Sequence, residues 1–213
     1  MGARDWLERR AGGAAALYDD VVGRLDRLAL AEARRNLLED VSGAVLELGC
    51  GTGAGFTYYA PEARVTALEP EPAFRLAASE RARAAAAEVT VLPGDAHDLP
   101  FPDATFDAVV AELMLCSLAR PDVALREAQR VLRPGGSLRL LEHVRHPRPW
   151  IGRLQDAFDP LWNAFEGRGC HIGRDTPRAV EEAGFHFERL DTVPLPLGVD
   201  WFFPIVTVRA RRP

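Results

Sequence analysis

Residues 44–55 read AVLELGCGTGAG and carry the strongest structural signal in the sequence. Its first five residues form a short apolar run that stops at Gly49, which predicts a buried strand followed by a tight turn. The turn has the spacing G-x-G-x-x-A, and Glu69 lies 20 residues beyond Gly49. Glycines let the backbone approach a ligand closely, and an acid at this distance suits the hydroxyls of a ribose. The stretch therefore predicts a nucleotide-binding loop, with a plain strand-to-helix turn as the alternative.

Strand and helix patterns alternate on both sides of this loop. Besides the run at 44–48, short apolar runs predict strands at 64–68, 89–92, 106–113 and 137–144. Amphipathic or alanine-rich patterns predict helices at 20–40, 72–87 and 122–132. Strands that alternate with helices at short spacing are typical of an α/β fold, in which helices cover both faces of a parallel sheet.

The pattern changes after residue 146. We expect an aromatic-rich helix over 150–165 that is broken at Pro160, a loop over 167–175 and a helix over 176–183. Residues 185–190 and 201–209 predict two closing strands, a pair that often forms an antiparallel edge.

At 213 residues the chain is predicted to be a single domain. Its expected parts are a helical cap (1–43), a ligand-binding core (44–145), a lid over the ligand edge of the sheet (146–184) and the closing strands (185–213).

Composition excludes several function classes. The formal net charge is −5, which argues against a nucleic-acid partner, and all 26 basic residues are arginine, which removes any lysine-dependent mechanism. The three cysteines form no C-x-x-C pair, so we expect reduced thiols, no metal site and a cytoplasmic protein. The charged N-terminus lacks the core of a signal peptide, and no uncharged apolar run reaches the ~18 residues of a membrane helix, which predicts no stable membrane insertion.

The loop alone leaves NAD and S-adenosylmethionine (SAM) open as ligands, but three later motifs separate them. Residues 94–96 read GDA, residues 99–107 read LPFPDATFD and residues 131–136 read VLRPGG. In this order, from about residue 45 to 144, the chain resembles class I SAM-dependent methyltransferases. The resemblance implies a Rossmann-like, mostly parallel seven-stranded sheet and SAM as the methyl donor. It assigns the cofactor site to Glu47, Gly49, Cys50, Gly51, Thr52, Gly53, Glu69, Pro70, Asp95, Ala96, Glu112 and Leu113.

The resemblance also implies a role for each acid in this set. Glu69 binds the ribose hydroxyls, Asp95 lies at the adenine and accepts from its amino group, and Glu47 helps to hold the ammonium. These groups of SAM are all donors, and carboxylates only accept. The alternatives are structural: Glu47 as a capping or loop acceptor, and Asp95 as a cap of its own turn.

Further motifs resemble the methyltransferase-like thiol S-methyltransferases. They are LMLCSL at 113–118, EHV at 142–144, QDAFDPLW at 155–162 and GCHIGRD at 169–175. The resemblance favours a small-molecule thiol acceptor. We place Tyr18, Cys116, Trp162 and Cys170 at the acceptor, and His143 as the base that forms the thiolate. The alternatives are ordinary packing for the cysteines, the aromatic residues and Tyr18, and a backbone-bonded strand end for His143.

The sequence therefore predicts S-methylation of a small thiol by a monomer or homodimer. The first alternative is an O- or C-methyltransferase of a quinone or natural-product intermediate, because such enzymes share the core motifs. A non-catalytic SAM-binding partner protein is the alternative of another class. An NAD-dependent dehydrogenase is disfavoured, because the chain has no lysine and the downstream motifs do not suit that class.

Overall fold

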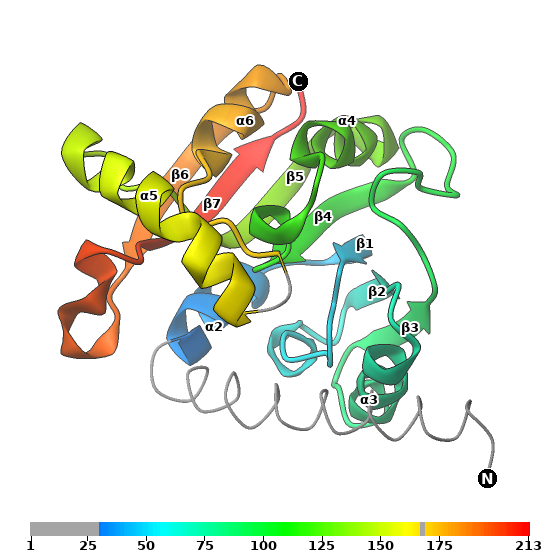
Figure 1. Cartoon of the computed structure of the whole chain (residues 1–213). Coiled ribbons are helices and arrows are strands. Elements are labelled where there is room, and N and C mark those ends of the chain that lie inside the picture. The colour runs from blue at the N-terminus through cyan, green and yellow to red at the C-terminus, as the bar shows by residue number, and fades with distance from the viewer. Residues whose placement is uncertain (1–29, 167–168) are drawn as a thin grey trace, which may run out of the picture.

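The computed structural model describes residues 30–166 and 169–213, which form one seven-stranded sheet with helices packed on it (Figure 1). The strands are β1 (Gly43–Leu48), β2 (Ala63–Leu68), β3 (Glu88–Leu92), β4 (Phe106–Glu112), β5 (Leu132–His143), β6 (His186–Val193) and β7 (Ile205–Arg211). Their order across the sheet is β3-β2-β1-β4-β5-β7-β6. The strand order reverses between β1 and β4, and open α/β sheets bind ligands outside the carboxyl ends of the strands at such a point.

Strand directions confirm the predicted fold class. Strands β1 to β5 pair in parallel, and β7 is antiparallel to both β5 and β6. The closing strands thus form the expected antiparallel pair. Their position differs from simple chain order, because β7 lies between β5 and β6.

Helices cover both faces of the sheet, as predicted. They are α2 (Ala31–Leu38), α3 (Pro72–Ala82), α4 (Pro121–Val131), α5 (Pro149–Glu166) and α6 (Thr176–Glu182). Short 3₁₀ turns are η2 (Phe56–Tyr58), η3 (Leu115–Ser117) and η4 (Pro196–Trp201). Alternating strand residues separate two cores: Leu46 packs with α4 and α6, and Val45 packs with α2 and α3. This alternation is the period-2 geometry of a strand that is buried on both faces.

Several sequence predictions are wrong in detail. The helix predicted over 72–87 ends at Ala82, and the strand predicted over 137–144 begins at Leu132. Helix α5 runs through Pro160 without a break. Proline removes the hydrogen bond to the carbonyl of residue 156, but both residues are exposed, so water can solvate that carbonyl. The strand predicted over 201–209 is also misplaced, because residues 196–201 form η4 and β7 begins only at Ile205.

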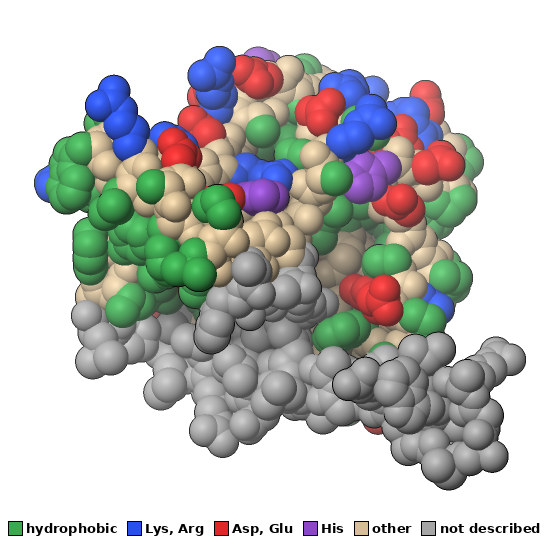
Figure 2. Space-filling view, viewed as in Figure 1, with side chains coloured by type: hydrophobic (Ala, Val, Ile, Leu, Met, Phe, Trp, Pro, Cys, Tyr) green, Lys and Arg blue, Asp and Glu red, His purple; other side chains and the backbone are tan. Residues whose placement is uncertain are grey.

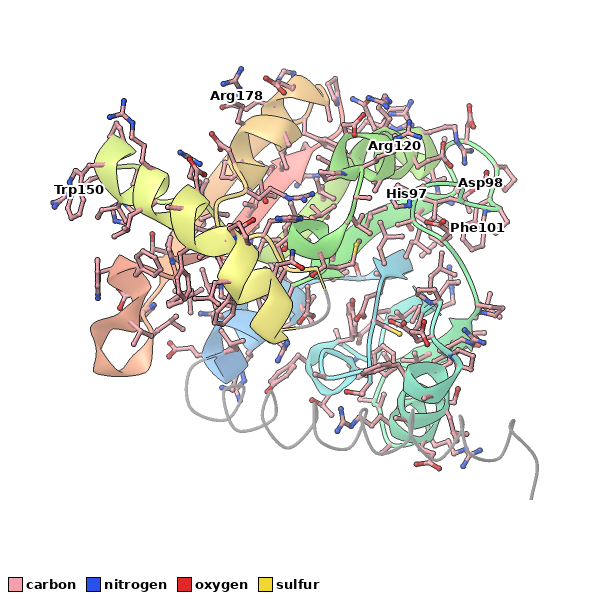
Figure 3. The ribbon with its side chains drawn as sticks, viewed as in Figure 1. His97, Asp98, Phe101, Arg120, Trp150 and Arg178 are labelled. Atoms are coloured by element: carbon pink, nitrogen blue, oxygen red, sulfur yellow. The ribbon has the colours of Figure 1, made fainter. Side chains whose placement is uncertain are left out.

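Large apolar side chains gather on the outer surface of α5 and η4 (Figure 2). Trp150, at the outer end of α5, is 59% exposed and points away from the body of the protein (Figure 3). Leu154 and Leu161 on α5 and Trp201 on η4 are exposed as well. Within the part of the chain that the structure describes, no helix combines the length and the apolar character that crossing a membrane needs.

Candidate functional site

A cavity of about 530 Å³ lies at the carboxyl ends of β1 to β4. All of the predicted cofactor residues except Gly53 line it. They come from four connections that are distant in sequence but meet at one sheet edge, as parallel strands require. A volume of this size is typical of small-molecule sites. The structure therefore brings together the residues that the motifs assign to the cofactor, and their role in binding stays a prediction.

The glycines of the loop after β1 have different tasks. Gly49, Gly51 and Gly53 all have positive φ, at 61°, 57° and 82°. A Cβ on Gly53 would lie 2.5 Å from the ring of Phe56, so glycine at this position allows Phe56 to pack behind the loop. A Cβ on Gly51 would meet no atom within 4 Å, and Gly51 lines the cavity. The absence of a side chain at Gly51 therefore leaves space for a ligand and not for a protein neighbour.

Glu69 joins the glycine loop to the end of β2. Its carboxylate accepts hydrogen bonds from the backbone N–H of Gly51 (2.9 Å) and of Glu71 (3.0 Å), one on each oxygen. Each carboxylate oxygen has more than one acceptor position, so Glu69 can still accept from a diol in the cavity. The loop and the acid predicted to bind one nucleoside thus form one hydrogen-bonded unit.

Two carboxylates line the cavity on the α2 side: Glu47, which is buried, and Glu112, whose side chain is 7% exposed. Glu112 forms an ion pair with Arg34 of α2, and Glu47 accepts a hydrogen bond from the Tyr59 hydroxyl at 2.8 Å. Burial, together with the charge of Glu112, raises the pKa of Glu47. The Oε1 atom of Glu112 is buried and has no hydrogen-bond partner among the described residues. An acceptor in this position fits a cationic ligand group such as an ammonium.

Asp95 lines the cavity, but its carboxylate mainly accepts hydrogen bonds within its own turn. Its Oδ1 accepts from the backbone N–H of His97 at 2.9 Å and lies 2.6 Å from the His97 ring. These hydrogen bonds lower the pKa of Asp95, and its side chain is 67% exposed. His97 and Asp98 lie side by side on the same loop (Figure 3). The turn-cap alternative is therefore realised, and a contact with adenine would have to use the other oxygen.

The structure does not bring the predicted acceptor residues to the cavity wall. Cys116, Cys170 and Trp162 belong to a separate apolar cluster under α5, in which the two sulfur atoms lie 3.5 Å apart. The hydrogen bond from Cys170 and burial raise the pKa of the Cys116 thiol, which stays protonated and unreactive at neutral pH. Tyr18 lies outside the described residues. These four assignments stay predictions.

His143 ends β5 and does not line the cavity. Its Nδ1 atom is buried and has no hydrogen-bond partner among the described residues. Burial lowers the pKa of His143 to about 4, so the imidazole is neutral at pH 7 and is a weak base for a thiol. A catalytic role for His143 stays a prediction that the geometry does little to support.

The lowered pKa of His143 gives a testable dependence of stability on pH. Below about pH 6.5 the unfolded chain protonates this imidazole, whereas the folded chain does so only near pH 4. We expect His143 to remove at most about 3 kcal/mol of folding free energy as the pH falls through this window. Urea unfolding at pH 7 and pH 4.5 measures the effect by comparing the wild type with His143→Gln.

The control for this prediction is His186→Gln, a change at an exposed position on β6. It should leave the pH dependence as it is in the wild type. Because other groups titrate equally in all three proteins, the difference between variants isolates His143. An identical pH dependence in the wild type and His143→Gln would show that this imidazole titrates alike in the folded and unfolded chains.

Several residues of the cavity wall lie outside the set that the motifs assigned to the cofactor. They are Arg34, Ala54, Gly55, Leu68, Glu71, Ala73, Phe74, Gly94, Met114, Ser117 and Leu118. Most adjoin a predicted residue, so the motifs could have located them by extension. Arg34 is different, because it reaches the site from α2 through an ion pair across 78 positions of sequence.

Comparison with known proteins identifies this arrangement. The profile of a family described as methyltransferase domain matches residues 46–140. These residues are a methyltransferase domain. The chain is 41% identical over 160 residues to thiol S-methyltransferase TMT1B of Homo sapiens, an alignment that covers 72% of this chain and 64% of that protein. The chain thus spans less than two thirds of the length of that relative.

Two further comparisons relate the methyltransferase domain to known proteins. The chain is 35% identical over 150 residues to the ubiquinone/menaquinone biosynthesis C-methyltransferase UbiE of Dinoroseobacter shibae, covering 70% of this chain and 57% of that protein. Its fold matches that of geranyl diphosphate methyltransferase, solved in complex with SAM, with a TM-score of 0.69 at 18% identity over 86% of this chain and 84% of that one. The class I fold and the resemblance inferred from the motifs are confirmed.

The cavity of the methyltransferase domain fits SAM on its own chemistry. SAM presents an ammonium, two ribose hydroxyls and an adenine amino group, all of which are donors. The cavity offers Glu112, Glu69 and Asp95 as acceptors, and Gly51 leaves open space beside them. Across residues 30–166 and 169–213, no three His, Cys, Asp or Glu side chains are grouped so that they could hold a metal ion.

Proposed function

We propose that this chain is a SAM-dependent methyltransferase that methylates the sulfur of a small, fairly apolar thiol. The observation that carries the proposal is the cavity at the switch point of a methyltransferase domain, where the glycine loop, Glu69 and Glu112 converge. The thiol is favoured over other acceptors because TMT1B, at 41% identity, is named a thiol S-methyltransferase, whereas three relatives named as ubiquinone/menaquinone biosynthesis C-methyltransferases are 35–37% identical.

Bound SAM supplies an electrophilic methyl group on a sulfonium. In the proposal, Glu69 accepts from the ribose hydroxyls, Glu112 and Glu47 face the ammonium, and the backbone at Gly51 allows close contact. The acceptor thiolate attacks the methyl carbon in line. A new sulfur–carbon bond forms as the old one breaks, which leaves a methyl thioether and S-adenosylhomocysteine. The enzyme mainly positions the two reactants and excludes water.

The proposal needs no strong base in the protein. A thiol with a pKa near 8.5 is already partly ionised at neutral pH, and the thiolate is the nucleophile. We therefore assign deprotonation to the solvent in the first instance. We keep the predictions of a cytoplasmic enzyme, a small-molecule acceptor and a monomer or homodimer as parts of the same proposal.

An acceptor screen tests the proposal. Purified chain and SAM are incubated with thiols, phenols, quinols and amines, and S-adenosylhomocysteine and the methylated product are quantified. We expect turnover of apolar thiols. Glu69→Ala should weaken SAM binding, measured by calorimetry, by about 1–3 kcal/mol, because charge-assisted hydrogen bonds are lost. Glu80→Ala, at an exposed position on α3, is the matched control and should bind SAM normally.

Each result of the screen has one meaning. Turnover of quinols or phenols without turnover of thiols would overturn the thiol assignment but leave the methyltransferase assignment intact. SAM binding without turnover of any acceptor would favour a non-catalytic SAM-binding protein.

The pH dependence of activity tests His143 separately. Activity that His143→Ala loses at pH 7 and regains at pH 9 would support a role as the base, and equal loss at both pH values would indicate a structural role.

A further inference from the structure

Glu142, near the end of β5, is fully buried and binds a loop of the cavity wall. Its Oε1 accepts from the backbone N–H of Met114 (2.9 Å) and of Leu115 (2.8 Å). Its Oε2 accepts from the backbone N–H of Cys116 at 3.2 Å. Three consecutive amides thus converge on one carboxylate. A buried carboxylate is stabilised by such donors or by a cation, so three amides at one carboxyl favour its charged form.

The loop that Glu142 binds is strained at its start. Leu113 has φ of +51°, a conformation that side chains other than glycine rarely adopt. Strained residues of this kind persist only where their surroundings hold them, and they gather at functional sites. Leu113 and Met114 line the cavity, and so do Ser117 and Leu118 just after the bound amides. The path of this loop therefore shapes the cavity.

The other side of the same loop binds the segment that follows α5. The carbonyl of Cys116 accepts from the N–H of His171 at 3.0 Å, and Arg174 donates to the carbonyls of Leu115 (3.1 Å) and Leu118 (2.6 Å). The amides of residues 114–116 thus point to Glu142. The carbonyls of Leu115, Cys116 and Leu118 accept from residues 171–174. A change at Glu142 must move the cavity wall and its contact with this segment together.

We propose that ionised Glu142 is a positioning residue for methyl transfer, which holds the strained 113–117 loop so that the acceptor approaches the methyl group in line. The inference rests on the proposed methyltransferase function and extends it to a residue that does not touch the cavity. Glu142 acts through the backbone of the loop. Its removal should lower kcat more than it changes the affinity for SAM.

The positioning role of Glu142 can be tested through the charge of its carboxylate. Protonation turns one acceptor position of Glu142 into a donor, which faces N–H groups that can only donate. Burial raises the pKa of Glu142 to about 7, and the three amides oppose that shift. The neighbouring Cys116 thiol keeps its proton, because Cys170 and burial raise its pKa. Arg174 and His171 bind the carbonyl side of the loop, and His143 follows Glu142 in β5 with a pKa of about 4. If the amides leave while Glu142 stays buried, its pKa rises further, so the released loop binds the proton more tightly than the held loop. The loop should therefore loosen as the pH falls below about 7.

The experiment compares the full-length wild type with Glu142→Gln and Glu142→Leu. Amide hydrogen exchange of residues 113–117, corrected for intrinsic rates, is measured without ligand between pH 5.5 and 8, and kcat, KM and SAM affinity are measured in parallel. Glutamine can still accept on Oε1, but its NH₂ group meets the Cys116 N–H. We expect protection of the loop to fall about tenfold in Glu142→Gln and further in Glu142→Leu, with kcat reduced 10- to 100-fold and SAM affinity changed less than threefold.

The matched control is Glu127→Gln on α4, which removes a carboxylate that accepts from the Leu99 N–H at 2.9 Å but does not bind this loop. It should leave exchange of 113–117 and kcat unchanged. The wild-type loop should lose protection at low pH, and Glu142→Gln should not show this change. Unchanged loop exchange in Glu142→Gln, or an equal loss of protection throughout the sheet, would overturn the proposal.

The exchange measurement also separates this inference from the acceptor assignment, because it uses neither SAM nor a thiol. If no thiol turns over but Glu142→Gln loosens the loop, the thiol assignment fails and the positioning of the loop stands. The kinetic comparison then uses whichever acceptor the screen identifies. Normal kcat in Glu142→Gln with that acceptor would overturn the catalytic part of the inference.

Discussion

Replacing Gly51 with alanine should abolish SAM binding and leave the fold nearly intact. The added methyl group meets no protein atom within 4 Å, because it enters the cavity. The φ of +57° makes alanine strained there, at a stability cost of about 1 kcal/mol. A ligand that packs on this loop has no room for the methyl group. We expect affinity for S-adenosylhomocysteine to fall at least 100-fold, about 2.7 kcal/mol. Calorimetry and urea unfolding measure the two effects.

Two other glycines provide controls for the Gly51 variant. Gly135 has φ of +74° and equally open surroundings, but it lies near the start of β5, where pairing with β4 is irregular, and it does not line the cavity. Gly135→Ala should show the same small loss of stability with normal binding. In Gly53→Ala the new methyl group meets the buried Phe56 ring, so stability should fall by about 1–3 kcal/mol from overpacking. Normal binding by Gly51→Ala would mean that the cofactor does not pack on the loop.

Replacing Arg34 with methionine should destabilise the protein by about 3–5 kcal/mol. The guanidinium is 3% exposed and pairs with Glu112, whose charge, against the effect of burial, raises the pKa of Arg34. Its loss leaves Glu112 and Glu47 buried near each other without this cation. Urea unfolding should show a larger loss at pH 8 than at pH 5, because burial raises the pKa of Glu47, so the folded variant can protonate Glu47 at low pH and remove the repulsion.

The double variant Arg34→Met with Glu112→Gln should recover part of this loss, because it removes both charges. Arg139→Met is the matched control. Arg139 is also buried, at 8% exposure, but its partner Asp40 has a side chain that is 49% exposed and stays solvated when the pair is broken. The control should lose less stability and show little difference between pH 5 and pH 8. A double variant as unstable as Arg34→Met would indicate that packing of the arginine, and not its charge, supports α2.

Local signals account for the parts of the structure that the sequence predicted. The first strand, the glycine loop and Glu69 follow from hydrophobic runs, glycine spacing and a fixed distance, all of which are properties of neighbouring residues. The carboxyl ends of parallel strands meet at one edge, so the cofactor residues could be grouped without knowledge of the side-chain packing. This is why nearly the whole predicted set lines one cavity.

The parts of the structure that the sequence did not predict depend on contacts between distant segments. Arg34 reaches the cavity through Glu112, 78 residues away, and no spacing in the sequence indicates that pair. Cys116 and Cys170, which we placed at the acceptor, lie in the apolar cluster below α5, and their depth there follows from how that helix packs. Helix α5 continues through Pro160 at a position where residues 156 and 160 are both exposed, which the sequence pattern does not reveal.

The place of β7 in the sheet has a consequence for how the chain folds during synthesis. Strand β6 pairs only with β7, and β7 is made last of the seven strands. Until residues 205–211 have left the ribosome, β5 presents an open edge and β6 has no strand to join. The five parallel strands can assemble as translation proceeds, because N-terminal parts fold first. Completion of the sheet must then be a late step, in which β7 inserts between β5 and β6.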